Sequence, residues 1–224
     1  MTTGDELVPP SERPGPGQIR EGNTLHLAAL ARAAGADVVR SGVVRDDEGA
    51  LAETFGRLLS EVDVLVTTGG VSMGKYDLVG EAFEACGVEP VFHKVAIKPG
   101  KPVWFGVHGE TLVFGLPGNP VSCLVGQEVF VRPALAKLGG AEEGSWVRTP
   151  RRARWVGAAT RRNDREQYLP VRATHGADGV DELESVRWKS SADLVGLSRA
   201  DGFAIVPPGE ELGAGDVASY LPLA

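Results

Sequence analysis

The sequence predicts a two-domain α/β protein, in which a mainly parallel sheet with helices on both faces is followed by a small β-barrel domain. Over residues 1–140, apolar segments of strand length alternate with segments whose apolar residues recur at helical spacing, a pattern typical of a parallel sheet covered on both faces. A glycine-rich linker over residues 139–144 follows, and helical periodicity stops there. The last domain, residues 145–224, contains short strand-like runs separated by turn residues, as small barrels do.

The individual elements are predicted from apolar spacing and from residues that cap helices. Asn23 is suited to the N-cap of the first helix and Gly35 to the position after its end, and Asp46 or Asp47 can open the second helix. The expected helices cover residues 23–34, 46–62, 77–86 and 121–138. The expected strands cover residues 36–44, 63–68, 91–95, 102–107 and 111–116, the last two joined by a turn at 108–109, and in the barrel domain 154–158, 168–173, 202–206 and 216–221.

The composition excludes several classes of partner. A net charge of −7 and a sequence pI near 5.2 argue against nucleic acid and against an anionic membrane, because both normally bind a basic face. Arginine is concentrated in residues 148–172, so an anionic small molecule stays a candidate ligand. No apolar run approaches the roughly 18 residues of a membrane span. The first residues lack the basic and apolar regions of a signal peptide, so we expect a cytoplasmic protein.

The cysteines and histidines form no ligand or catalytic pattern. Cys86 and Cys123 lie far apart and match no zinc-ligand spacing, so we expect two core thiols. The four histidines show no metal-ligand spacing, and no Ser/His/Asp arrangement can be argued from them. Covalent nucleophilic catalysis is therefore not indicated.

A glycine-rich loop over residues 67–74 follows an apolar strand. Its three glycines allow backbone conformations in which amide groups converge on an anion, as in a phosphate cradle, although the loop lacks the Walker pattern and a full dinucleotide fingerprint. A tight turn is the alternative. Asp77, three residues beyond the loop, can hold Mg²⁺ near a phosphate, cap the next helix, or do both.

Two further loops favour an anionic ligand. Lys98 and Lys101 lie in a loop stiffened by two prolines, and two ammonium groups held close together indicate an oxyanion between them, the alternative being solvated surface lysines. In the segment 115–122, Asn119 suits the N-cap of the long helix and Pro120 its first turn, so the free N–H groups there either bind an anion or serve only as a well-capped start. We expect the three loops to share one sheet edge.

Two carboxylates stand beside a glycine near the start of the chain. Asp5 and Glu6 can coordinate Mg²⁺ or orient water. A solvated pair at a frayed terminus is the alternative.

Five segments appear in an order and at a spacing that identify a family. They are TGDELVPP, GPGQIREGN, VTTGGVSMGKYDLV, VFHKVAIKPGKPVWFG and VFGLPGNPVSCLV. Together they resemble the molybdopterin molybdenumtransferases, the family of MoeA and the gephyrin E domain. The resemblance implies a molybdopterin-binding-like α/β domain over residues 1–140. Residues 145–224 resemble the family's C-terminal β-barrel domain through the shorter motifs DREQY at 164–168 and WKSS at 188–191.

The resemblance implies a role in molybdenum cofactor biosynthesis. The family inserts molybdate into adenylylated molybdopterin and releases AMP, with Mg²⁺ as the metal, and the full-length protein is expected to be a homodimer. Two alternatives stay open. One is a paralogue that uses tungstate, because the two oxyanions share shape and charge, and the other is a non-catalytic module that binds molybdopterin.

The resemblance also assigns roles to particular residues of this sequence. The residues implied to bear on Mg²⁺ and the phosphoanhydride are Asp5, Glu6 and Asp77. Those implied to shape the nucleotide and pterin pocket are Gly69, Gly70, Ser72, Gly74, Pro117, Gly118, Asn119 and Pro120. Those implied to hold molybdate are Lys98, Lys101, Ser122, Arg165 and Ser191. Asp5, Glu6, Asp77, Lys98 and Lys101 form the expected catalytic set.

One departure from the family concerns the N-terminal side. The family carries a linker-like domain, a second inserted domain and the first strand of the α/β domain before the TGDEL motif, and the sequence shows none of them ahead of Thr3. An internal strand absent from a parallel sheet leaves backbone groups unpaired. We therefore expect an open slot in the core and a shortened chain of reduced stability and activity.

Overall fold

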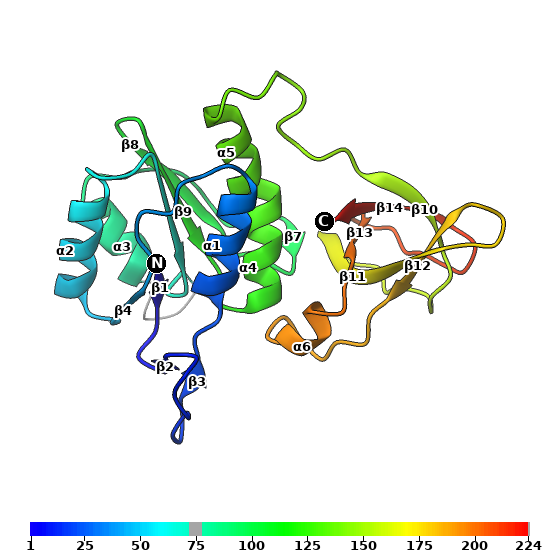
Figure 1. Ribbon diagram of the computed structural model, residues 1–224, viewed down its shortest axis with the longest axis horizontal. Coiled ribbons are helices and arrows are strands. Elements are labelled where there is room, and N and C mark those ends of the chain that lie inside the picture. Colours follow the sequence, from blue (N-terminus) through cyan, green and yellow to red (C-terminus); the bar gives the residue numbers. More distant parts are fainter. Residues whose placement is uncertain (72–77, 224) are drawn as a thin grey trace. The chain divides into compact units, whose positions relative to one another are not determined.

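The computed structural model describes residues 1–71 and 78–223. The chain divides into two compact units (Figure 1). The first, termed the α/β unit, comprises Met1–Val95 and Pro102–Trp146. The second, termed the barrel unit, comprises Ala96–Lys101 and the chain from Val147 onward. The short segment 96–101, expected in the first domain, thus belongs to the second.

A six-stranded sheet forms the centre of the α/β unit, in the order β4-β1-β5-β9-β8-β6. The strands β4, β1, β5 and β9 run parallel, whereas β8 and β6 are antiparallel to their neighbours. The sheet is therefore mainly parallel, as predicted. Its strands are β1 (Thr2–Thr3), β4 (Val43–Val44), β5 (Val64–Thr68), β6 (Glu89–His93), β8 (Trp104–His108) and β9 (Thr111–Leu116).

Helices cover both faces of this sheet (Figure 1). On one face, α2 (Glu48–Leu58) and α3 (Leu78–Ala85) bury a cluster that includes Phe55, Phe83 and Trp104. On the other face, α1 (Asn23–Ala33) and the long helical segment 120–138 bury a cluster that includes Leu27, Leu116 and Val131. Because both faces are covered, β9 carries an almost continuous apolar sequence.

Two predicted helix features differ in the structure. Asn23 is the first residue of α1 and follows the N-cap Gly22, so it does not cap the helix. The closing helix consists of α4 (Pro120–Gly126), a π-helical turn (Gln127–Val131) and α5 (Arg132–Leu138). Pro133, near the start of α5, has no N–H to donate, which accounts for a local change in the bonding pattern. Asp47 does cap α2, since its side chain accepts a bond from the Ala50 N–H at 2.9 Å.

The expected strand 36–44 is reduced to the two residues of β4. β4 exists only where β1 lies beside it, with Thr2 opposite Val43 and Thr3 opposite Val44. Residues 36–42 have no strand structure. Thr2–Thr3 occupies the position between β4 and β5 that was predicted to be an open slot, but it does so over two residues only.

The barrel unit contains a closed five-stranded barrel with one added strand. Its strand order is β12-β10-β14-β13-β11-β7, and a further pairing of β12 with β11 closes the ring. Trp155, Leu183 and Phe203 are completely buried in this unit. The strands are β7 (Ile97–Lys98), β10 (Arg151–Trp155), β11 (Glu166–His175), β12 (Asp181–Ser185), β13 (Gly202–Val206) and β14 (Val217–Pro222), and a short helix, α6 (Leu194–Leu197), precedes β13.

Three described elements of the barrel unit, β7, β12 and α6, are absent from the sequence prediction. Of these, β7 comes from a segment far earlier in the chain. β7 joins the barrel by parallel pairing of Ile97 with Glu166 and of Lys98 with Gln167.

Outside the two main sheets, β2 (Leu7–Val8) and β3 (Ile19–Arg20) form a small parallel pair. Within the described parts of the chain, no helix is both long and apolar enough to cross a membrane.

Candidate active site

The turn that follows β5 is built from two glycines packed against Thr3. Gly69 and Gly70 have φ values of +93° and +65°, a region that side chains disfavour. A Cβ at Gly69 would lie 2.5 Å from the Thr3 carbonyl oxygen, and one at Gly70 would lie 2.4 Å from a Val79 methyl group. The Gly69 N–H donates to the Leu116 carbonyl at 3.0 Å, so this amide is not available to an anion. The first half of the loop is therefore a tight turn.

A second loop, residues 117–119, lies directly against this turn. A Cβ at Gly118 would lie 3.4 Å from the Gly69 Cα. The Asn23 side-chain amide donates to the Gly118 carbonyl at 2.6 Å and to the Thr68 hydroxyl at 3.0 Å. The Thr68 hydroxyl donates in turn to the Pro117 carbonyl at 3.2 Å. Buried polar bonds thus hold two of the predicted site loops side by side.

Asn23 is a site residue that sequence reasoning missed, because it was interpreted as a helix cap. Glu21 performs part of that task instead, since its Oε1 accepts a bond from the Thr24 N–H at 2.7 Å. Thr2 contacts the same carboxylate through its hydroxyl at 3.2 Å. Glu21, three residues before Thr24 in the first turn of the helix, was the available signal that Asn23 is free for another role.

The acidic pair near the chain start is exposed and lies beyond β1. A Cβ at Gly4 would lie 2.5 Å from a carboxylate oxygen of Glu6, so the Glu6 side chain folds back over this glycine. The Asp5 carboxylate accepts a bond from the Asp46 N–H at 3.3 Å. The two carboxylates therefore directly follow β1, next to Gly4 and to the Asp46 N–H.

Three residues predicted to belong to the site, Asn119, Pro120 and Ser122, lie at the start of α4 and differ in exposure. Asn119 is at the N-cap position and exposed, but its side chain makes no capping bond. Pro120 is in the first turn, as predicted. Ser122, implied to hold molybdate, is only 4% exposed.

In the barrel unit, the structure brings Arg165 together with the lysine loop. The Arg165 guanidinium donates from Nη1 to the Ile97 carbonyl at 3.2 Å, and its side chain is 29% exposed. Lys98 and Lys101 are both exposed, and Lys98 lies in β7 directly opposite Gln167 of β11. The expectation that the lysine loop shares a sheet edge with the glycine loops is wrong, because this loop pairs with the barrel.

Neighbouring polar residues fix the start of β11, which directly follows Arg165. The Gln167 side chain is buried and donates to the Arg161 carbonyl at 3.0 Å. Tyr168 donates from its hydroxyl to the Glu166 carboxylate at 2.7 Å. Burial, together with that bond, raises the pKa of the Tyr168 hydroxyl well above its ordinary value, so the phenol stays protonated.

Ser191, the last residue implied to hold molybdate, lies in the turn before α6. Asp193 caps that helix by accepting bonds from the Gly196 and Lys189 N–H groups, both at 2.9 Å. These two backbone bonds lower the pKa of the Asp193 carboxyl. The turn that carries Ser191 therefore has a defined conformation.

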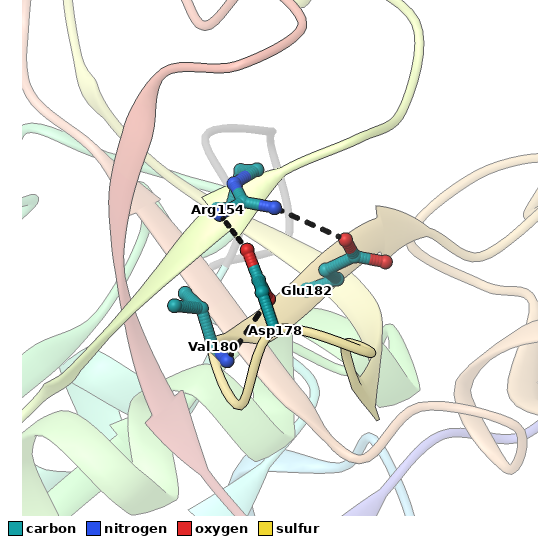
Figure 2. Close-up of polar contacts among 4 residues, drawn as sticks. All are labelled: Arg154, Asp178, Val180 and Glu182. Atoms are coloured by element: carbon teal, nitrogen blue, oxygen red, sulfur yellow. Dashed lines mark hydrogen bonds and ion pairs between the residues drawn. The ribbon is translucent and has the colours of Figure 1, made fainter.

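Several arginines of the basic segment are engaged by carboxylates of the same unit. Figure 2 shows Arg154 between Asp178 and Glu182, at 2.5 and 3.4 Å. The bond from Arg154 and a second one from the Val180 N–H lower the pKa of the Asp178 carboxyl. Arg162 pairs with Glu211 at 3.8 Å. These partners reduce the basic character that the sequence suggests for residues 148–172.

Three of the predicted residues, Ser72, Gly74 and Asp77, lie outside the described residues. Among the residues that are described, no group of three or more His, Cys, Asp or Glu side chains is placed to hold a metal ion.

Burial raises the pKa of the Cys123 thiol to about 12 and also raises that of Cys86. Neither thiol is a thiolate at neutral pH. Cys123 is a buried core thiol, as expected, whereas Cys86 is only partly buried at the edge of the α2–α3 cluster.

Comparison with known protein families covers both units. Residues 1–137 match the model described as the probable molybdopterin binding domain, and residues 152–223 match the MoeA C-terminal region (domain IV). The chain belongs to the molybdopterin molybdenumtransferase (MoeA) family. The resemblance inferred from the five sequence segments is thereby confirmed.

Curated molybdopterin molybdenumtransferases align along most of the chain. The protein of that name from Nostoc sp. is 34% identical over 214 residues, which make up 94% of this chain and 49% of the relative. Molybdopterin molybdenumtransferase 2 from Mycobacterium tuberculosis is 36% identical over 205 residues, 86% of this chain and 50% of the relative. The chain thus spans about half the length of the curated relatives it matches.

Solved structures of the MoeA family share the fold. A crystal structure of the molybdopterin biosynthesis MoeA protein from Pyrococcus horikoshii superposes with a TM-score of 0.83 at 32% identity, covering 100% of this chain and 53% of the archaeal chain. A second structure from that organism gives 0.74 at 24% identity, covering 98% and 51%. The predicted combination of a mainly parallel α/β sheet and a β-barrel is confirmed.

The site residues implied by the resemblance to the MoeA family fall into two groups, one in each unit. The α/β unit holds the acidic pair Asp5 and Glu6, the glycine turn and the 117–120 loop, which lie close together around Thr3. The barrel unit holds Lys98, Lys101, Arg165 and Ser191. We term the first group the glycine-turn cluster, and Lys98, Lys101 and Arg165 the lysine cluster; Ser191 lies in the same unit, in the turn before α6.

Proposed function

We propose that this chain takes part in the molybdenum-insertion step of molybdenum cofactor biosynthesis. In this step molybdate enters adenylylated molybdopterin and AMP is released. The observation that carries the proposal is that both family models match this chain, one to each unit. The names of the curated relatives, which are about twice as long, support the same reaction.

The glycine-turn cluster is proposed to bind the pterin and the phosphoanhydride. Gly118 is exposed and Gly69 and Gly70 are half-buried, so a flat ring or a phosphate can approach the backbone at this turn without meeting side chains of these three residues. Asn119 is exposed at the helix start beside this surface, and the helix dipole favours an anion there. Ser72, Gly74 and Asp77 complete the proposed set.

The lysine cluster is proposed to bind molybdate. The exposed ammonium groups of Lys98, in β7, and of Lys101, in the turn after it, together with the half-buried guanidinium of Arg165, just before β11, attract a small dianion. Their positive charge screens the repulsion between molybdate and a substrate that already carries phosphate and sulfur anions. Ser191 is proposed as a hydroxyl donor to the same oxyanion. For Ser122 this role requires local opening, because its side chain is buried.

The acidic pair fits a role in holding Mg²⁺. Carboxylate oxygens are the ligands this ion prefers, and Mg²⁺ usually keeps several waters while it uses one or two carboxylates and substrate phosphates. A cluster of three protein ligands is therefore not required. Asp5, Glu6 and Asp77 would hold the ion, which would neutralise phosphate charge as AMP leaves.

The test is AMP release by the purified chain mixed with adenylylated molybdopterin, molybdate and Mg²⁺. We expect release that depends on molybdate and that falls at least about tenfold in Asp5→Asn or Glu6→Gln, as expected when a charged ligand of the ion is lost. Glu12→Gln is the matched control, because it removes an exposed carboxylate from the neighbouring loop. Unchanged release in both site variants would contradict the metal role.

The same assay separates the alternatives. A chain that binds molybdopterin but releases no AMP under any condition is a binding module. Release driven by tungstate in preference to molybdate indicates the tungstate-using paralogue.

Sedimentation of the chain, and of a longer form that includes the relatives' remaining half, tests the proposed homodimer. Cell fractionation tests the proposed cytoplasmic location.

A further inference from the structure

The side chains of β11 project alternately from the two faces of the strand. Leu169, Val171 and Ala173 lie in or against the buried cluster inside the barrel unit. Because side chains two residues apart share a face, Glu166 and Tyr168 project from the other face of the strand. The carboxylate and the phenol ring are therefore on one side of β11, and the barrel interior is on the other.

Lys98 lies on the face opposite to Glu166. Its partner across the parallel pair is Gln167, which projects inward by the same alternation, and directly paired residues project to the same side. Glu166 itself is paired with Ile97, the residue before Lys98, and directly follows Arg165 in the chain. A carboxylate thus stands one residue away from two members of the lysine cluster.

A carboxylate in this position would compete with an anionic ligand. Opposite charges a few ångströms apart attract each other, more strongly where water is excluded. A Glu166 side chain turned toward the lysine cluster would cancel one of its three positive charges. The other neighbouring carboxylate, Asp164, is 90% exposed and has an oxygen 3.8 Å from the Arg165 Nε, so solvent screens this contact. The direction of Glu166 therefore matters more for the charge of the cluster.

Tyr168 fixes the direction of this carboxylate. Its hydroxyl donates to the Glu166 Oε1 at 2.7 Å, and Tyr168 is only 6% exposed. A hydrogen bond to an ionised acceptor is stronger than one between neutral groups. Burial and this bond raise the pKa of the phenol, so the hydroxyl remains a donor at neutral pH. Within the described part of the chain, Glu166 forms no ion pair with the cations of the lysine cluster.

We propose that Tyr168 is a positioning residue for the oxyanion site: its hydroxyl holds the Glu166 carboxylate on the far face of β11, so that the three cations of the lysine cluster stay available to a dianion. The inference rests on the proposed molybdate-binding function of this cluster. Tyr168 acts through Glu166 and does not itself contact the anion. Without the hydroxyl, the carboxylate turns toward the nearest cation, and an incoming dianion has to displace it.

The test is the affinity for molybdate, measured by calorimetric titration of the chain at low ionic strength. Tyr168→Phe removes the hydroxyl and keeps the ring, and we expect the Kd for molybdate to rise at least about fivefold. Adding Glu166→Gln to this variant removes the competing charge and should restore the Kd to within about twofold of the parent value. Glu166→Gln alone should not weaken binding.

The matched control is Tyr220→Phe. Tyr220 is also a buried tyrosine of the barrel unit, and its hydroxyl lies 3.5 Å from the Asp181 Oδ2. Its pairing partner is Arg151 of β10, so it lies away from the lysine cluster on the sheet. Loss of this hydroxyl should leave the Kd for molybdate unchanged.

Two further readouts separate the proposed electrostatic role from simple loosening of the barrel. The effect of Tyr168→Phe should shrink to less than about twofold when the salt concentration is raised from about 0.02 M to about 0.5 M, because salt screens exposed charges. A loosened fold would keep the loss at both concentrations. In NMR spectra recorded without molybdate, a side-chain N–H signal of Lys98, Lys101 or Arg165 should shift in Tyr168→Phe and return in the double variant.

Three results would overturn the inference. They are an unchanged Kd in Tyr168→Phe, a Kd that stays raised in the double variant, and an equal rise in Tyr220→Phe. A parent chain that binds no molybdate would instead contradict the proposed function of the lysine cluster. The side-chain N–H signals, which need no ligand, then decide whether Tyr168 holds Glu166 away from the cations.

Discussion

Asn23 and Gly118 are joined by a 2.6 Å hydrogen bond from the side-chain amide to the carbonyl, although the two residues lie 95 positions apart. The same amide donates to the Thr68 hydroxyl at 3.0 Å. Asn23 is 7% exposed, so both bonds are shielded from water. It thereby holds the end of β5 and the loop after β9 at a fixed spacing, and that spacing defines the glycine-turn cluster.

Replacement of Asn23 by Ala should weaken ligand binding and also lower stability. The change leaves the Gly118 carbonyl without its donor, which costs about 1–3 kcal/mol for a buried group. We expect a lower melting temperature and at least about a tenfold rise in the Kd for molybdopterin. Asn163→Ala, in the barrel unit, is the control for loss of an amide side chain. If pterin affinity is unchanged while stability falls, Asn23 has a structural role only.

Gly69→Ala should destabilise the chain more than the same change at a glycine of similar conformation. The added methyl group at Gly69 would lie 2.5 Å from the Thr3 carbonyl, whereas at Gly35, with φ +88°, nothing lies within 4 Å. Both changes carry the backbone penalty of roughly 1–2 kcal/mol. We expect Gly69→Ala to cost about 1–3 kcal/mol more, as for an overpacked site. Equal denaturation midpoints for the two variants would contradict the close packing described here.

Lys101→Ala should lower molybdate affinity more than molybdopterin affinity. Loss of one charge-assisted contact to a dianion corresponds to roughly 1–3 kcal/mol, or about a five- to 150-fold rise in Kd. Lys189→Ala removes another exposed lysine of the barrel unit and should leave both constants unchanged. Calorimetric titration of each variant with molybdate checks this. An unaltered molybdate constant in Lys101→Ala would remove this lysine from the site.

The elements that could be predicted are those specified by residues close together in the sequence. Apolar spacing and the cap residue Asp47 were sufficient for α2, and the apolar run before Gly69 was sufficient for β5. The role of Asn23 was missed because a local cap is the simplest interpretation of an asparagine before a helix, and its true partner is distant in the sequence. Likewise, the pairing of β7 with β11 depends on a contact between residues 97–98 and 166–167, which no local pattern reveals.

The strand expected at residues 36–44 was predicted wrongly for most of its length, although its local sequence is that of a strand. Its residues have the composition of a strand, and the prediction fails for residues 36–42 because a strand needs a partner on its edge. The site residues show the same division. The turn at Gly69 and Gly70 could be predicted from sequence because its positive φ values require glycine locally. The unit to which the lysine loop belongs was set by long-range pairing and could not be predicted.

The burial of His26 in α1 should make the stability of the folded chain depend on pH. Burial lowers the pKa of this imidazole below its ordinary value of 6.5, and a hydrogen bond to the Gly22 backbone and the charge of the Glu21 carboxylate only partly oppose the shift. The folded chain therefore prefers the neutral ring. Above pH 6.5 the ring is neutral in both folded and unfolded chains, so its contribution to stability is fully present. Below that pH the unfolded chain binds the proton first, and stability falls until the folded-state pKa is reached.

Replacement of His26 by Gln should accordingly flatten the pH dependence of unfolding on the acid side of pH 6.5. One titrating group contributes at most about 1.4 kcal/mol per pH unit to the free energy of unfolding. Urea denaturation at pH 7.5, 6.5, 5.5 and 5.0, values chosen to span roughly the histidine range, measures the slope in both chains. His175→Gln is the control, because that side chain is 74% exposed and lies in the barrel unit, so the His26 slope should persist. A slope of the same size in His26→Gln and in the parent chain would show that other groups carry the acid sensitivity of the fold.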